Sequence, residues 1–149
     1  MITDIIHGVA AKLHQDFGDG YAIYTENIPQ GFKEPCFSIQ HIQSDTAAKL
    51  PNRHLRRNAF DVHFFPKPGT DEKAQMYRMA ECLFLSLEYI NVRDNSNMLD
   101  NLVRGSKMRY EIVDGVLHFF VNYDLYIKVT ASDDGIPMEK LTSKSNVEE

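Results

Sequence analysis

The length of 149 residues and the balanced composition predict one soluble globular domain. The chain is 43% hydrophobic and 25% charged, with eight glycines and six prolines, which excludes collagenous and low-complexity classes. Sixteen Lys and Arg against twenty-one Asp and Glu give a formal charge of -5, which disfavours nonspecific binding to nucleic acid. Because no run of about 18 apolar residues occurs, we expect no membrane-spanning helix and no membrane partner.

The first predicted element is an amphipathic helix over residues 2–17. Its apolar residues recur at steps of three and four, the spacing that lines one helix face, and Gly18 supplies a stop. They are Ile2, Ile5, Ile6, Val9, Leu13 and Phe17. Polar residues interrupt this stripe, so it lacks the unbroken apolar run of a signal peptide, and we expect no secretion by that route.

Three strands are predicted before residue 66. Tyr21–Thr25 and Cys36–Ile42 are rich in β-forming residues, and Arg57–Phe65 alternates between polar and apolar side chains. Between the second and third strands, Gln43–Asn58 is polar and basic around Pro51. That segment predicts a loop or a flexible hairpin tip.

A second helix is predicted to begin after Thr70, whose side chain can cap it. Asp71 and Glu72 in its first turn are favourable near the positive end of the helix dipole. Its expected buried face consists of Met76, Met79, Ala80, Leu83, Phe84 and Leu87. The following segment, Asn91–Lys107, is rich in Asn and Asp and predicts a loop with at most one helical turn.

The sequence Asp114-Gly115 predicts a tight hairpin. It is typical of a two-residue type I′ turn, and it stands between two runs of alternating residues. The implied register places six side chains on one face as three pairs: Ile112 with Leu117, Tyr110 with Phe119, and Met108 with Val121.

The second hairpin strand is unusually long. The same face continues through residue 129, giving about 13 residues, where five or six are usual. Such a strand extends beyond the core sheet or is covered by a neighbouring subunit, and a strongly bent strand shared by two sheets is the alternative. Residues 131–149 are polar and predict a flexible tail, which leaves residues 1–130 as the domain.

These elements together predict an α+β fold. We expect a mixed, mainly antiparallel sheet with a long C-terminal hairpin, packed against two main helices.

No complete catalytic, cofactor or metal motif is present. The six histidines match no spaced metal motif. His41, His63 and His118 fall on predicted strands and could converge, with Asp61 or Asp124 completing a site. The simpler interpretation is separate polar positions on a sheet face. We therefore expect no catalytic residue, no cofactor and no metal.

The two cysteines, Cys36 and Cys82, form no CxxC pair and are too few for a disulfide scaffold. We expect both to be reduced and packed, with Cys82 on the core-facing side of the second helix.

One basic cluster is the main candidate for an assembly interface. Arg53, His54, Leu55, Arg56 and Arg57 lie within the predicted loop, where a simple solvated loop is the alternative. The functional interpretation is a contact with an acidic protein surface or a nucleic-acid backbone. The hairpin turn at Asp114 and Gly115 joins this candidate interface.

Several weak motifs, taken in order, resemble the tail terminator proteins of tailed bacteriophages and prophages. The resemblance covers about residues 1–130 and rests on the N-terminal helix, Ala22-Ile23-Tyr24 through Ile28-Pro29-Gln30-Gly31, Glu34-Pro35-Cys36-Phe37-Ser38-Ile39, Phe60-Asp61-Val62-His63-Phe64-Phe65-Pro66 and Asp114-Gly115-Val116-Leu117-His118-Phe119.

The resemblance implies a structural protein and not an enzyme. Such a protein forms a ring, expected to be a hexamer of itself, on the completed tail tube, and it stops tube polymerisation there. Its implied partners are the tail tube protein and a neck or head-completion connector, and the resemblance leaves open whether the sheath protein is a further partner. DNA is implied to pass through the ring without specific binding. The implied location is the neck end of the virion tail, after assembly in the host cytoplasm.

Three rival functions remain open from the sequence. Another neck or tail-completion protein would differ only in its partner. A small metal-dependent nuclease or hydrolase would use Asp61, His63 and His118. A host-encoded adaptor would bind an extended peptide along a strand edge.

Overall fold

The computed structural model describes residues 1–94, 99–131 and 137–141. In chain order its elements are α1 (Ile2–Phe17), the 3-10 helix η1 (Gly18–Gly20), β1 (Ala22–Tyr24), β2 (Cys36–Leu50), β3 (Arg53–Phe65), α2 (Glu72–Ser86), β4 (Tyr89–Asp94), β5 (Leu99–Val113), β6 (Val116–Ala131) and β7 (Pro137–Leu141). Neither helix in these ranges has the length and hydropathy needed to cross a membrane.

The strands form one mixed sheet in the order β1-β2-β3-β6-β5-β4, and β7 pairs with the end of β6. β1 runs parallel to β2, and the remaining pairs are antiparallel. The predicted α+β class, with its mainly antiparallel sheet, long hairpin and two main helices, is confirmed.

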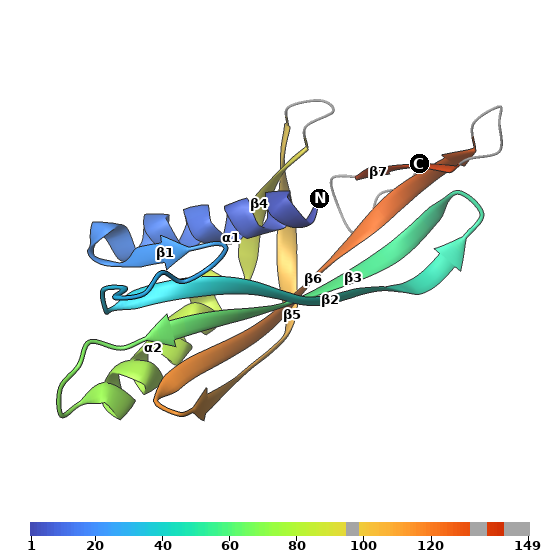
Figure 1. The fold of residues 1–149 in the computed structure, drawn as a ribbon. Coiled ribbons are helices and arrows are strands. Elements are labelled where there is room, and N and C mark those ends of the chain that lie inside the picture. The colour runs from blue at the N-terminus through green and yellow to red at the C-terminus, as the bar shows by residue number, and fades with distance from the viewer. Residues whose placement is uncertain (95–98, 132–136, 142–149) are drawn as a thin grey trace.

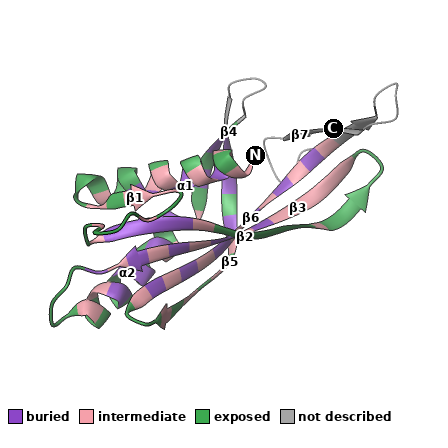
Figure 2. Ribbon diagram, in the orientation of Figure 1, coloured by how far each residue is buried: buried purple, intermediate pink, exposed green. Residues whose placement is uncertain are grey.

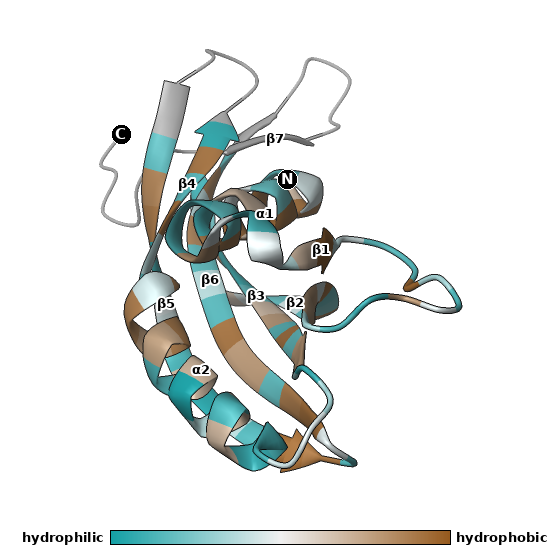
Figure 3. Cartoon of the chain, turned by 90° about the vertical axis from the view of Figure 1, so that its left-hand side faces the viewer, coloured by the Kyte–Doolittle hydropathy of each residue, from teal (hydrophilic) through white to brown (hydrophobic). Residues whose placement is uncertain are grey.

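One face of the sheet is covered by both helices (Figure 1, Figure 3). α1 contacts β4 at one end of the strand order and β2 near the other, so the sheet curls around this helix. The core beneath the helices joins Val9 of α1 and Leu83 of α2 to Phe60, Phe119 and Tyr123 of the sheet. Figure 2 shows the resulting alternation of buried and partly exposed residues along β3 and β6.

The two helices follow their predicted patterns with three differences. α1 ends before Gly18, whose φ of 79° favours glycine, as expected. α2 begins one residue later than predicted, with Asp71 and not Thr70 at its N-cap, and no side chain caps it. Phe84 is only partly buried and packs against Phe119 with ring centroids 5.0 Å apart. Cys82, expected in the core, is exposed.

Two segments lie in strands where a loop or hairpin tip was predicted for the first and a loop for the second. Gln43–Asn58 forms the outer halves of β2 and β3, and only Pro51 and Asn52 turn between them. Asn91–Lys107 contributes to β4 and β5, with residues 95–98 outside the described ranges. Polar side chains on both faces hid the alternation in the first segment, because a strand signal requires one apolar face.

The hairpin prediction is confirmed for its turn and its first pairs. Asp114 and Gly115 have φ of 52° and 75°, as a type I′ turn requires. Ile112 faces Leu117 and Tyr110 faces Phe119. The expected pairing of Met108 with Val121 is wrong, because the register shifts between Ser106 and Arg109 at a β-bulge.

β6 is longer than predicted, with 16 residues, and each part of it pairs with at least one other strand. It pairs with β3 from Leu117 to Lys128, and β7 pairs with Ile127 to Ala131. β7 lies inside the predicted flexible tail, so that part of the tail is a strand. The remaining tail residues, 132–136 and 142–149, lie outside the described ranges.

Candidate functional site

The outer halves of β2 and β3 form a hairpin arm, residues 42–58, whose β3 strand also pairs with β6. The arm extends away from the two helices (Figure 1). From His41 to Leu50, every β2 residue is exposed except Thr46, which is partly exposed. β1 pairs with β2 only at Cys36, Phe37 and Ser38, so in the described chain the outer edge of the β2 arm strand has no partner strand. Unpaired backbone N–H and C=O groups on such an edge can pair with another chain.

The arm strand also carries devices that restrict indiscriminate edge pairing. Its register shifts at two points, between His41 and Gln43 and between Thr46 and Ala48, and bulges of this kind twist an edge away from flat pairing. Ile42 and Leu50 are 51% and 45% exposed. The arm therefore offers two apolar side chains on an irregular edge, which suits a partner of matching shape.

A polar bridge fixes the base of the arm. Asn58 is fully buried; its Oδ1 accepts from Ser44 Oγ at 2.7 Å, and its Nδ2 donates to the Tyr123 carbonyl at 3.0 Å. These bonds connect β2, β3 and β6. Because a buried amide left unpaired costs free energy, the bridge favours one orientation of the arm.

The predicted basic cluster lies on β3, the inner strand of the arm, and is not a loop. Its five residues, Arg53 to Arg57, are partly exposed and lie between β2 and β6. Arg57 donates from Nε and Nη2 to Asp45 at 2.8 and 2.9 Å. This hydrogen bonding lowers the pKa of Asp45 and raises the pKa of Arg57. Arg53 lies over the Tyr126 ring, 5.2 Å from its centroid.

The other two candidate interface residues lie at the opposite end of the sheet. Arg53 pairs with Lys128, near the end of β6, whereas Asp114 and Gly115 precede its first residue, Val116. Twelve residues of strand separate those two ends, a distance of about 40 Å at 3.3 Å per residue. The structure thus does not bring the basic cluster and the hairpin turn together.

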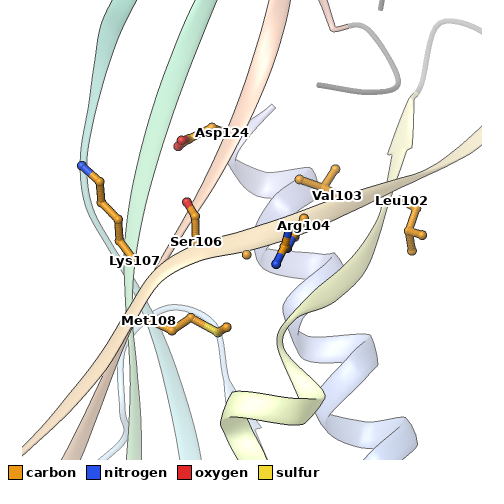
Figure 4. A pocket seen from close by; sticks show the side chains of 8 residues that line it. Leu102, Val103, Arg104, Ser106, Lys107, Met108 and Asp124 are labelled. Atoms are coloured by element: carbon orange, nitrogen blue, oxygen red, sulfur yellow. The ribbon is translucent and has the colours of Figure 1, made fainter. Parts of the chain in front are cut away.

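A pocket of about 500 Å³ lies where β5 diverges from β6 (Figure 4). Ser106 and Lys107 of β5 and Asp124 of β6 are among the residues that line it. Burial raises the pKa of Asp124, and the positive charges of Arg57 and Lys107 oppose this shift. Asp124 faces Arg57 in the β3–β6 register, so the pocket adjoins the base of the arm.

The structure brings together three of the five residues considered for a metal-assisted site. Asp61, His63 and His118 place their ligand atoms within 4.8 Å of one another. His41 instead hydrogen-bonds Ser44, with Nε2 2.9 Å from Oγ, and Asp124 lines the pocket. The three clustered side chains project from the sheet face opposite the helices, because Val62, Phe64 and Phe119, their neighbours in sequence, are in the core.

The cysteines offer no further reactive site in the core. Cys36 is fully buried, as expected, and burial, with a smaller contribution from the charge of Glu34, raises the pKa of its thiol to about 11. The thiol therefore stays protonated and unreactive at neutral pH.

A family model described as "Phage tail terminator protein" matches residues 4–135. The chain belongs to the phage tail terminator family. No curated protein matches the chain. The match includes most of α1, the arm, the pocket and the clustered histidines, so these features belong to the tail terminator domain.

Membership in the tail terminator family makes this chain a structural protein of the bacteriophage tail, where it associates with tail and head components. The resemblance found in the sequence is confirmed at this level. What the sequence interpretation missed is the tail terminator's long open edge along β2. A signal was available there: Thr46 is a β-former, and Pro51 and Asn52 are turn-forming residues in the centre of the segment.

Proposed function

We propose that this protein caps the completed tail tube as a ring of identical subunits, expected to be a hexamer. The ring stops tube polymerisation, presents the surface to which a neck or head-completion protein attaches, and lets DNA pass through its opening. It acts without catalysis at the neck end of the virion tail, after assembly in the host cytoplasm. The family match over residues 4–135 carries this proposal.

The arm supports a ring as the form of assembly. A closed ring of identical subunits requires that one surface meets a different surface of the next subunit. The unpaired β2 edge and the hairpin turn at Asp114 and Gly115 lie at opposite ends of the sheet, so they can face different neighbours. We assign the arm edge, with Ile42 and Leu50, to one of these contacts, and the basic cluster beside it to an acidic part of the same neighbour.

Capping is tested by mixing the purified protein with its cognate tail tube subunit during polymerisation. We expect shorter tubes with a ring of added density at one end, measured by electron microscopy, and light scattering reports the mass of the free protein. Tubes of unchanged length without bound protein would contradict the terminator function and favour another neck component.

A substitution on the arm tests the assigned contact surface separately from the capping function. We expect Leu50→Asp to abolish capping with folding intact, because it places a charge on the apolar edge contact. Leu85→Asp on α2 is the matched control, since Leu85 is 79% exposed and lies outside the arm. Normal capping by Leu50→Asp would overturn the arm assignment and leave the terminator proposal standing.

A further inference from the structure

The polar face of the sheet holds three metal-ligand side chains in one cluster. His63 of β3 lies directly opposite His118 of β6 in the strand register, and Asp61 lies two residues before His63 on the same face. Directly opposed residues have Cβ atoms about 5 Å apart, so backbone pairing alone sets the spacing of the two imidazoles. Their ring centroids are 4.4 Å apart.

Both imidazoles meet the same carboxylate oxygen. Asp61 Oδ2 lies 2.9 Å from His63 Nε2 and 3.0 Å from His118 Nδ1. Ligand atoms that surround a tetrahedral zinc ion at about 2.0 Å are about 3.3 Å from one another. The two oxygen–nitrogen distances would therefore need to lengthen by only a few tenths of an ångström to fit one ion, and the two imidazole nitrogens already lie within 4.8 Å of each other.

The second oxygen of the same carboxylate favours a cation at this position. Asp61 Oδ1 is buried and has no hydrogen-bond partner among the described residues, although the two imidazoles lie beside Oδ2. A buried carboxylate oxygen without a partner is costly. Both imidazoles contact only Oδ2. A cation bound by the Asp61 carboxylate would compensate the negative charge of the whole group, which these contacts meet at one oxygen alone.

Neighbouring aromatic side chains hold the imidazole rings in place. Phe120 stacks with His118 at 6.3 Å and 18°, and Phe65 meets His63 edge-on at 6.3 Å. The side chains of Asp61, His63 and His118 are 13%, 21% and 23% exposed. The cluster is thus ordered on the protein side and accessible from solvent, as in sites with three protein ligands and one open position.

We propose that Asp61, His63 and His118 bind one divalent transition-metal ion of the zinc class, with the fourth position open. Two imidazole nitrogens and one carboxylate oxygen suit zinc, cobalt or nickel, whereas magnesium and calcium take oxygen ligands. This ion would connect β3 to β6 on the uncovered face. The proposal replaces the expectation of no metal site and does not depend on the capping function.

The test is zinc binding by the untagged full-length protein, measured by isothermal titration calorimetry. We expect one zinc ion per chain, undisturbed by excess magnesium. We expect Asp61→Asn and His118→Asn each to weaken the affinity at least about tenfold, since loss even of outer-shell partners has an effect of this size. Circular dichroism of each variant verifies its fold.

The matched control is His14→Asn. His14 lies 3.3 Å from Asp19 in an exposed pair, and no group of three metal-ligand side chains among the described residues includes it, so we expect unchanged zinc affinity. Absence of zinc binding, or equal affinity in wild type, Asp61→Asn and His118→Asn, would overturn the proposal and leave a hydrogen-bonded cluster.

Two further readouts do not depend on calorimetry. Cobalt bound in place of zinc should give the visible absorption of a tetrahedral site in the wild type, and the Asp61→Asn variant should lose it. Saturating zinc should raise the Tm of the wild type, because an ion that binds only the folded state stabilises it. An octahedral cobalt spectrum or an unchanged Tm would contradict a site built from these three ligands.

Discussion

Gly8 shows how one missing side chain sets the packing of α1. A Cβ at this position would lie 2.4 Å from the Asn91 carbonyl oxygen of β4, which is inside any tolerated contact. Helix propensity alone favours alanine over glycine by about 1 kcal/mol. We nevertheless expect Gly8→Ala to lower the free energy of unfolding by about 1–3 kcal/mol, as overpacked sites do, measured by urea denaturation.

The control at the same scale is Gly20→Ala in η1. A Cβ there meets nothing within 4 Å, so we expect a change of at most about 0.5 kcal/mol. If Gly8→Ala stabilised the protein, α1 would not approach β4 this closely.

At the scale of elements, the β5–β6 hairpin depends on the backbone of its turn. Gly115 has a φ of 75°, and a Cβ added to it would have no atom within 4 Å, so Gly115→Ala would only strain the left-handed backbone. We expect a loss of about 1 kcal/mol in the free energy of unfolding, measured by urea denaturation. Asp114→Asn should be neutral, because asparagine tolerates this conformation. Equal stability of Gly115→Ala and wild type would show that the turn relaxes to another type.

The elements predicted correctly are those in which local pattern and burial agree. α1 has apolar residues at helical spacing and a glycine stop, and the β5–β6 turn has a sequence that permits few alternatives. The arm was missed because β2 from His41 to Leu50 has no buried face, so its strand conformation comes from pairing with β3 and not from its own periodicity. Cys82 was misplaced because its position one residue before Leu83 lies outside the narrow stripe that α2 buries.

The candidate sites were likewise predicted in part from the sequence, and the remainder required the strand register. The sequence named Asp61, His63 and His118 as residues that could converge, yet only the strand register shows that they do and that His41 and Asp124 do not. The basic cluster was recognised from composition. Its position on an inner strand and the contact of Arg57 with Asp45 depend on the pairing of β2 with β3. The spacing of residues along the sequence does not reveal that pairing.

At the scale of the whole molecule, the charge distribution predicts weak interaction with DNA. The formal charge is -5, and several arginines lie against acidic partners: Arg57 with Asp45 at 2.8 Å, Arg109 with Glu111 at 2.7 Å and Arg104 with Glu88 at 3.6 Å. Affinity for duplex DNA without sequence preference grows with the number of phosphates that Lys and Arg neutralise. Paired arginines on an acidic protein neutralise few.

We therefore expect the free protein not to retard duplex DNA in a gel at about 0.15 M salt and protein concentrations up to about 10 μM, a limit that lies within the range of about 1–100 μM typical of nonspecific dissociation constants. Asp45→Asn provides the informative comparison, because it removes the carboxylate that binds Arg57 and raises the net charge by one. Retardation by the wild type that weakens steeply with salt would show that the arm presents a phosphate-binding surface, which would hinder passage of DNA through a ring. Retardation only by Asp45→Asn would show that the Asp45–Arg57 pair keeps this surface from holding DNA.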